Sequence, residues 1–186
     1  MSGARHPTTA ELEAGLDAIR ASPREAGVLE MIVRRPAVGV REILEEAELD
    51  IARGLVGNTW HTRRSGRTPD GSPHPDMQLN IMSSRAAALV AERKDRWALA
   101  GDQLFIDLDL SEKNVPPGTR LAVGSAILEV TAQPHTGCQK FVERFGREAM
   151  LFVNSSVGRE LHLRGINARV VQPTGTATRS SPRPLS

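Results

Sequence analysis

The chain contains a single cysteine, Cys138, within the run Pro134-His135-Thr136-Gly137-Cys138-Gln139-Lys140-Phe141. A lone cysteine forms no internal disulfide, so it serves as a small packed side chain, as a metal ligand or as a reactive thiol. Its thiolate is both a soft metal ligand and a sulfur nucleophile, and it can also carry sulfane sulfur as a persulfide. Gly137 allows close approach of the backbone to a ligand, and His135 and Lys140 lower the pKa of the thiol if the fold brings them near it.

Two basic residues follow the cysteine at helical spacing. Lys140, one of only three lysines, lies four residues before Arg144, so a helix starting at Gln139 puts both on one face. Two cations on one face repel each other unless an anion lies between them, which favours a phosphate site. The alternative is a solvated surface that Glu143 and Glu148 neutralise.

A second basic group lies in the segment that follows Asn58. Arg63, Arg64 and Arg67 fall at or within the loop expected over residues 62–75, which is rich in Arg, Gly, Pro and Ser. Guanidinium groups bind phosphate with two parallel hydrogen bonds, so these arginines are candidates to close an anion pocket. The alternative is a mobile, solvated loop.

Other kinds of site are excluded by spacing. The histidines have no zinc-type spacing with one another or with Cys138, and the chain has neither a glycine-rich phosphate loop nor a nucleophile-elbow serine. Arg147, Arg164 and Arg169 are weaker candidates for anion binding. Asp102, which follows Gly101, is expected to cap a turn.

The composition indicates one globular domain with an aliphatic core. The chain has 186 residues, of which 39% are apolar and 25% charged, and aromatic residues make up only 3%. No apolar run reaches the length of a membrane span, and no apolar segment follows the basic N-terminus, so we expect neither membrane insertion nor a secretion signal. With one cysteine, this predicts a cytoplasmic location.

The charge is unevenly distributed along the chain. The net charge is +2, but residues 1–50 have a balance of −4 and residues 51–186 a balance of +6. The part that contains Cys138 is therefore the one suited to an anionic ligand, although a solvated arginine-rich surface gives the same count. The pI of about 9.2 reflects the lack of tyrosine and the small excess of arginine, and it does not indicate nucleic-acid binding.

Hydrophobic periodicity and turn residues predict many short elements. Thr8 and Glu11 form a capping-box pattern before a helix that ends at Ser22-Pro23. Strands are predicted over residues 28–34, 76–81, 104–110 and 166–172, with a hairpin around Gly124-Ser125. Short helices are predicted over residues 41–49, 139–145, 148–152 and 157–161, and Ser83 or Ser84 is expected to cap another. Short strands separated by turns suggest a β-barrel with added helices, although the pattern alone also allows an α+β fold.

Several blocks together resemble the MOSC domain, which is the C-terminal domain of molybdenum-cofactor sulfurases and also occurs as stand-alone bacterial proteins. The blocks are Gly54-Leu55-Val56-Gly57-Asn58, Gly101-Asp102-Gln103-Leu104, the run from Thr136 to Phe141 with Arg144-Phe145-Gly146, and the run from Arg164 to Val171. Their order and spacing make the resemblance specific, and it covers roughly residues 25 to 172. Family members often have Asp at the position of Asn58.

The resemblance implies a mainly β fold, a closed irregular β-barrel with several short helices. It assigns residues 25–172 to a MOSC-like domain, which leaves an N-terminal helical extension (1–24) and a tail (173–186) that its Pro-, Thr-, Ser-, Gly- and Arg-rich composition predicts to be disordered. It also implies that Cys138 is the catalytic residue and metal ligand for molybdenum cofactor (molybdopterin). Candidate cofactor-binding residues are Lys140, Arg144, Arg63, Arg64, Arg67, Asn58 and His135.

Two functions follow from the resemblance. Some relatives reduce N-hydroxylated compounds, and here such an oxidoreductase needs a separate electron donor because ferredoxin-type cysteines are absent. Others carry sulfur and are fused to a pyridoxal-phosphate desulfurase, a domain for which this chain has no room, so a carrier needs a separate cysteine desulfurase. A third possibility is a barrel that mediates contacts without chemistry. No nucleic-acid or membrane partner is expected.

Overall fold

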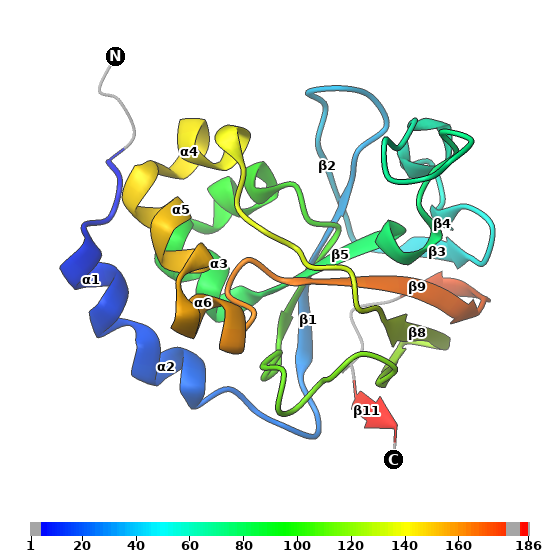
Figure 1. The fold of residues 1–186 in the computed structure, drawn as a ribbon. Helices are drawn as coiled ribbons and strands as arrows, with labels where there is room; N and C mark the ends of the chain where they lie inside the picture. Colours follow the sequence, from blue (N-terminus) through cyan, green and yellow to red (C-terminus); the bar gives the residue numbers. More distant parts are fainter. Residues whose placement is uncertain (1–4, 178–182, 186) are drawn as a thin grey trace.

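The computed structural model describes residues 5–177 and 183–185, and it is mainly β with short helices gathered on one side (Figure 1). Eight strands form the main sheet in the order β11-β7-β8-β9-β5-β6-β1-β2, and three form a smaller sheet in the order β10-β3-β4. In chain order the strands are β1 (Val28–Arg34), β2 (Glu42–Leu44), β3 (Ala47–Asp50), β4 (Gly54–Leu55), β5 (Leu79–Ser83), β6 (Leu104–Asp107), β7 (Arg120–Val123), β8 (Ala126–Val130), β9 (Ile166–Gln172), β10 (Thr174–Ala177) and β11 (Arg183–Leu185).

The helices are short and mostly pack together. They are α1 (Thr9–Ala14), α2 (Leu16–Arg20), α3 (Ser84–Ala91), α4 (Gln139–Phe145), α5 (Arg147–Asn154) and α6 (Ser156–Glu160), with 3-10 turns η1 (Trp60–Thr62), η2 (Pro75–Met77) and η3 (Lys94–Ala100). α3 and η3 form the crossover between β5 and β6, which are parallel. This crossover ends immediately before Gly101 and Asp102, at the entrance to β6.

The predicted closed barrel is wrong, because the main sheet is a strongly curled half-barrel that stays open. Its end strands, β11 and β2, do not pair with each other in the described residues. Both are only three residues long, and the neighbouring strands β3 and β4 belong to the separate small sheet. Too little paired backbone is therefore available at these edges to close the sheet.

The central strands are buried on both faces, so the molecule has two apolar clusters. In β6, Leu104 and Ile106 belong to the cluster enclosed by the curled sheet, whereas Phe105 belongs to the cluster beneath the helices. In β5, Ile81 and Met82 divide in the same way, as successive side chains of a strand must. The predicted alternation over residues 104–110 is confirmed, although the regular strand ends at Asp107.

Most predicted elements are present. The capping box of Thr8 and Glu11 begins α1, Ser83 caps α3, and the hairpin around Gly124-Ser125 joins β7 to β8. The segment expected as a strand over 76–81 starts its strand only at Leu79, because Pro75 opens a 3-10 turn.

The helix predicted over residues 41–49 is wrong, because this segment contains β2 and β3. The burial of β3 alternates, with Ala47 and Leu49 buried and Glu48 exposed. That period of two suits a strand with one face on a core and does not suit a helix. Here pairing with β1, β4 and β10 outweighs the helix preference of the Glu-rich sequence.

The tail differs from the disorder expected for residues 173–186. β10 pairs with β3, and β11 pairs with β7. These contacts are made by the backbone, for which a polar composition gives no signal. Residues 178–182 and 186 lie outside the described residues. Within the described residues, no helix is long and apolar enough to cross a membrane.

Candidate functional site

Cys138 lies at the junction between an extended segment and α4. Its backbone is extended (φ −126°, ψ 179°), and its carbonyl oxygen accepts hydrogen bonds from the amides of Phe141 (2.9 Å) and Val142 (3.2 Å). Its side chain forms no capping hydrogen bond, and the residue is exposed. The fold therefore presents the thiol to solvent instead of packing it in a core.

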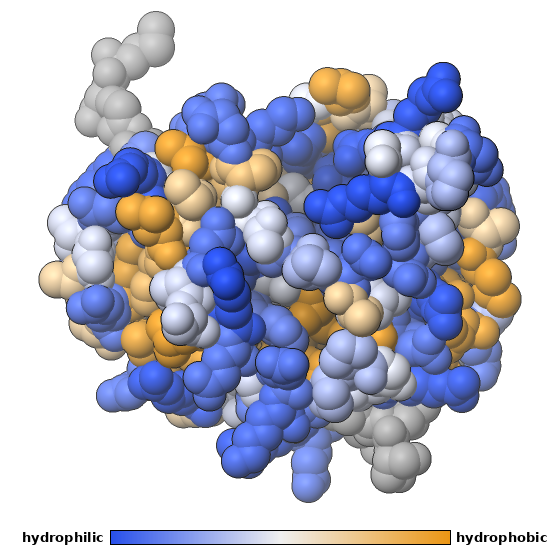
Figure 2. Space-filling view, viewed as in Figure 1, coloured by the Kyte–Doolittle hydropathy of each residue, from blue (hydrophilic) through white to orange (hydrophobic). Residues whose placement is uncertain are grey.

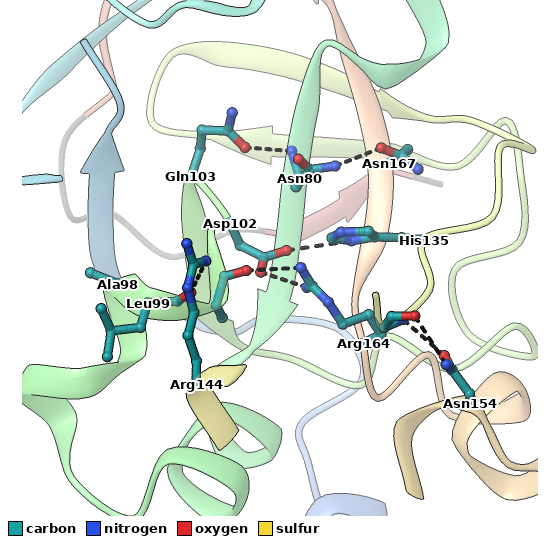
Figure 3. A network of polar contacts seen from close by, with 12 residues as sticks. Asn80, Ala98, Leu99, Asp102, Gln103, His135, Arg144, Asn154, Arg164 and Asn167 are labelled. Carbon is teal, nitrogen blue, oxygen red and sulfur yellow. Dashed lines mark hydrogen bonds and ion pairs between the residues drawn. The ribbon is translucent and has the colours of Figure 1, made fainter. Parts of the chain in front are cut away.

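Gly137, just before the cysteine, is held by the side chain of Asn154. The amide of Gly137 donates to Asn154 Oδ1 at 2.8 Å, and Asn154 Nδ2 donates to the carbonyl oxygen of Gly137 at 3.2 Å (Figure 3). Asn154 is the last residue of α5. The segment that leads into Cys138 is thus attached to the helical side of the molecule.

His135 and Arg164 both point toward Asp102, which is fully buried (Figure 3). Arg164 donates to Asp102 Oδ2 at 2.6 Å and to the carbonyl oxygen of Ala100 at 2.9 Å. His135 Nδ1 lies 3.4 Å from Asp102 Oδ1, within ion-pair distance, but the two atoms form no hydrogen bond. Asp102, expected to cap a turn, instead contacts His135 in the 131–138 segment and Arg164 just before β9.

Burial controls the protonation of this group. Burial, together with the positive charges of Arg164 and Arg35, holds the pKa of His135 well below its ordinary value. The imidazole is therefore neutral at pH 7, and its approach to Asp102 is a dipolar contact instead of an ion pair. Burial also raises the pKa of Asp102, while Arg164 and Arg35 oppose that rise by stabilising the carboxylate.

Arginines from separate segments converge on residues 98–102, at the end of the β5–β6 crossover. Three successive carbonyl oxygens each accept from a different one: that of Ala98 from Arg41 at 3.2 Å, that of Leu99 from Arg144 at 2.6 Å, and that of Ala100 from Arg164. A Cβ atom added at Gly101 would lie 3.7 Å from a terminal nitrogen of Arg35 and 3.9 Å from one of Arg144. We call Arg35, Arg41, Arg144 and Arg164 the arginine cluster.

The charges in the arginine cluster are poorly compensated. Burial and the nearby charge of Arg63 lower the pKa of Arg35 to about 10, with Asp102 acting in the opposite direction. Burial and the charges of Arg144 and Arg63 also lower the pKa of Arg41. The Nε atoms of Arg35 and Arg164 are buried and have no hydrogen-bond partner within the described residues. Cations that disfavour one another and keep free donors form an anion-binding arrangement.

The predicted cofactor-binding residues divide into three groups. Arg144 is part of the arginine cluster, Arg63 adds its charge beside it, and the side-chain oxygen of Asn58 accepts from the backbone amide of Arg35 at 2.9 Å. Arg64 and Arg67 make contacts within the 62–77 region, near Gly71 and with Met77 Sδ. Lys140 is exposed and has no hydrogen bond or ion pair to any described residue. Among the weaker candidates, Arg164 lies in the cluster, whereas Arg169 pairs with Glu129 and Asp76.

Sequence reasoning did not identify Arg35 and Arg41. They flank Pro36 and follow a predicted strand, and their separation from Arg144 in the sequence hides their proximity in the fold. The one available signal was an arginine pair, Arg34-Arg35, at the end of a buried strand. Arg34 pairs with Glu42, which leaves Arg35 as the member that turns toward the cluster.

Cys138 is tied to the arginine cluster from both sides along the chain. Three residues before it, His135 lies beside Asp102, and six residues after it, Arg144 binds the carbonyl oxygen of Leu99. Three residues of extended chain span at most about 11 Å, so the α-carbon of Cys138 lies within that distance of the α-carbon of His135. The cysteine and the arginine cluster therefore lie in the same region of the molecule.

A separate cavity of about 450 Å³ lies along the segment before the thiol. Its wall includes residues 130–136, the end of α5, α6 and the start of β9, and it does not include Cys138. Val130, Val153 and Ile166 supply apolar surface, while His135 and Asn154, which also hold the 135–137 segment, line it. Hydrophilic side chains cover most of the face shown in Figure 2, and hydrophobic ones form smaller groups on the helical side and on the opposite side.

No group of three or more His, Cys, Asp or Glu side chains that could hold a metal ion occurs in the part of the chain that the structure describes. Cys138 is therefore not part of a metal site built from protein side chains alone within these residues.

Comparison with known proteins identifies the fold. No family model matches the chain, and no curated protein matches it in sequence. Among solved structures, the YuaD protein of Bacillus subtilis is similar with a TM-score of 0.61 at 16% identity, covering 87% of this chain and 97% of YuaD. YiiM of Escherichia coli has a TM-score of 0.54 at 22% identity, covering 86% of this chain and 70% of YiiM. The chain therefore has a MOSC-like fold.

Proposed function

We propose that this protein binds molybdenum cofactor, with the arginine cluster holding the phosphate and Cys138 as the thiolate ligand of the metal. The observation that carries the proposal is the convergence of Arg35, Arg41, Arg144 and Arg164 on residues 98–102, which His135 contacts three residues before the exposed thiol. The MOSC-like fold supports the same assignment.

Each part of the site has a distinct task. Arg35 adds positive charge close to residues 98–102, and Arg144 keeps donors free beyond the one bound to Leu99. Arg63 adds charge at the exposed edge. Asp102 reduces the repulsion between Arg164 and Arg35, because its carboxylate interacts with the charges of both. Cys138 supplies the soft sulfur ligand.

When bound, the cofactor supplies a metal that exchanges electrons and oxygen with a substrate. We infer that the substrate is an N-hydroxylated compound. Its reduction to the amine consumes two electrons and two protons and releases water, and the electrons come from a separate protein donor. The chain's own residues bind and orient the cofactor. His135 is neutral at pH 7, so the positive charge at the site comes from the arginines.

The exposed thiol also favours a second function, a sulfur carrier. In that case the thiolate of Cys138 attacks the terminal sulfur of a persulfide on a cysteine desulfurase. A new sulfur–sulfur bond forms on Cys138 as the donor's bond breaks, and the donor cysteine leaves as a thiolate. This function needs only an accessible thiol and does not need the arginine cluster.

Cys138→Ser separates these functions from a structural role. The two side chains are close in volume and the thiol is exposed, so the free energy of unfolding should change by less than about 1 kcal/mol. Protein purified from cells that make the cofactor should lose bound molybdenum or sulfane sulfur, because a hydroxyl is neither soft nor easily ionised. Loss of molybdenum supports the cofactor site, and loss of sulfane sulfur alone supports the carrier. Equal contents of both in the two proteins reject both functions.

A further inference from the structure

Gly137 is held on both of its polar backbone groups by one side chain, that of Asn154. The Gly137 amide donates at 2.8 Å, and its carbonyl accepts at 3.2 Å. Such a paired contact fixes the plane of the side-chain amide against the backbone as well as the distance between them. This carbonyl belongs to the peptide bond that joins Gly137 to Cys138. Its orientation therefore also fixes the position of the Cys138 amide nitrogen.

Packing leaves no space for this segment to shift toward α5. A Cβ atom added at Gly137 would lie 3.1 Å from Val153 Cγ2, 3.2 Å from Met150 Cγ and 3.3 Å from Asn154 Nδ2. These distances are tighter than ordinary contact, so only glycine lets the backbone reach Asn154 without displacing these neighbours. The contact between Gly137 and Asn154 thus depends on both residues: the glycine allows the close approach, and the asparagine makes the hydrogen bonds.

Asn154 is not needed for the turn that follows it. Ser155 makes that turn, because its hydroxyl donates to the carbonyl oxygen of Phe152 at 2.7 Å and accepts from the amide of Gly158 at 3.0 Å. The hydrogen bonds of the Asn154 side chain go to Gly137, with one further contact to Met150 Sδ. Its polar atoms therefore serve the segment before Cys138 instead of the helices on which Asn154 lies.

We propose that Asn154 is the positioning residue of the Cys138 thiol, holding the Gly137–Cys138 peptide so that the cysteine keeps one backbone orientation. The importance of this orientation rests on the proposed function. The effect on the thiol itself does not, because it is measured without molybdenum or a sulfur donor.

The cavity next to Asn154 makes the proposal unusually testable. Asn154 lines the cavity of about 450 Å³, so shortening this side chain enlarges that space beside Gly137. Formamide or acetamide carries the same donor and acceptor as the lost side chain. Either molecule can enter beside Gly137 in Asn154→Ala and restore both hydrogen bonds. An alcohol of similar size has no amide group and cannot replace both contacts.

The experiment compares three variants of the full chain. Asn154→Ala removes both hydrogen bonds to Gly137, and Asn154→Asp keeps an acceptor for the amide but loses the donor for the carbonyl. Ser155→Ala is the matched control, because it removes side-chain hydrogen bonds at the adjacent residue without touching Gly137. Cys138 is the only cysteine, so alkylation reports on this thiol alone.

In Asn154→Ala we expect the alkylation rate of Cys138 and its pH profile to move toward those of the unfolded chain at the same pH. Hydrogen exchange of a peptide covering residues 131–140 should become roughly five- to tenfold faster, the effect of losing about one hydrogen bond's net stabilisation. Asn154→Asp should fall between wild type and Asn154→Ala. Ser155→Ala should leave both readouts unchanged, and acetamide should restore them in Asn154→Ala.

Three outcomes overturn the proposal: unchanged alkylation and exchange in Asn154→Ala, equal changes in Ser155→Ala, or no recovery with either amide. If Asn154→Ala unfolds, Asn154→Asp with the same two readouts decides the question. Failure of the proposed function appears elsewhere, as wild-type protein without molybdenum or sulfane sulfur, and it leaves these measurements interpretable.

Discussion

Arginines occur in two neighbouring regions of this molecule, and the fold treats them differently. In the arginine cluster, Arg41, Arg144 and Arg164 donate to the carbonyl oxygens of residues 98–100, and Arg164 also pairs with the buried carboxylate of Asp102. In the loop after η1, Arg64 and Arg67 are exposed, Arg64 lies beside Gly71 and Arg67 contacts Met77 Sδ in the same region. Arg63 stands between the two, since its charge acts on Arg35 and Arg41.

The contrast shows what turns arginines into a site. Both regions are rich in basic residues, but in the cluster Arg41 and Arg144 are held by neutral carbonyl acceptors, which fix a guanidinium without cancelling its charge. Carboxylates do the opposite elsewhere in the molecule, where Arg169 meets both Glu129 and Asp76. A basic residue bound to backbone carbonyls therefore keeps its attraction for an outside anion.

The largest effect should come from removing the carboxylate on which the cluster is built. Asp102→Asn leaves Arg164 buried without a counter-charge, and breaking a buried ion pair in this way costs about 3–5 kcal/mol in the free energy of unfolding. Urea denaturation measures this loss. Asp107→Asn is the control, because its partner Arg85 is about one-third exposed and the pair should contribute less than about 1 kcal/mol. Equal losses in the two variants contradict the buried-pair assignment.

The next effect tests the two arginine regions directly. In Arg35→Gln/Arg144→Gln, pyrophosphate binding should weaken by about ten- to a hundredfold, since each lost charged hydrogen bond contributes about 1.5–3 kcal/mol, partly offset by relief of repulsion. In Arg64→Gln/Arg67→Gln it should weaken less than about threefold. Isothermal titration at constant ionic strength gives both values. If the loop pair matters more, the anion site lies in the loop.

A smaller effect concerns pH. Because the folded-state pKa of His135 is lowered, the unfolded chain binds more protons below about pH 6.5, so stability falls as pH drops through that range. Between pH 6.5 and 5 the loss should be on the order of 1–2 kcal/mol. His135→Asn should flatten this part of the profile, as measured by urea denaturation at each pH. A parallel profile in the variant assigns the proton uptake to another group.

The smallest effect should come from Lys140. It is exposed and outside the arginine cluster, so Lys140→Ala should weaken pyrophosphate binding by no more than about twofold, and 0.5 M salt should remove the difference. A loss of tenfold or more places Lys140 inside the anion site, and the boundary of the cluster then needs to be redrawn toward α4.

The sequence predicted those elements of the fold that residues close together in the chain determine. Caps such as Thr8 and Ser83, the hairpin at Gly124, and the strand and helix on either side of Cys138 follow from residues within a few positions of one another, and they are present. The helix predicted from Arg41 to Leu49 was wrong because pairing with distant strands determines the conformation of this segment. The open edges of the sheet also depend on pairing that no local pattern encodes.

The candidate site shows the same division. Cys138 and Arg144 could be proposed from the sequence because they lie close together along the chain and in a recognisable block. Arg35 and Arg41 could not, because they reach the site from a distant strand end. Nor did any pattern show that Asn154 holds Gly137 across 17 residues, since an asparagine at a helix end is ordinarily assigned to the helix.

The ion pair between Asp102 and Arg164 spans 62 residues and has a consequence for how the protein is made. During synthesis, β1, β5 and β6 are available long before Arg164 leaves the ribosome, so the nascent chain must keep Asp102 hydrated or protonated until then. The sheet around β6 therefore cannot close over that carboxylate early. Release of the last quarter of the chain then completes the core and the anion site in one event, so a truncated product should not carry a half-built site.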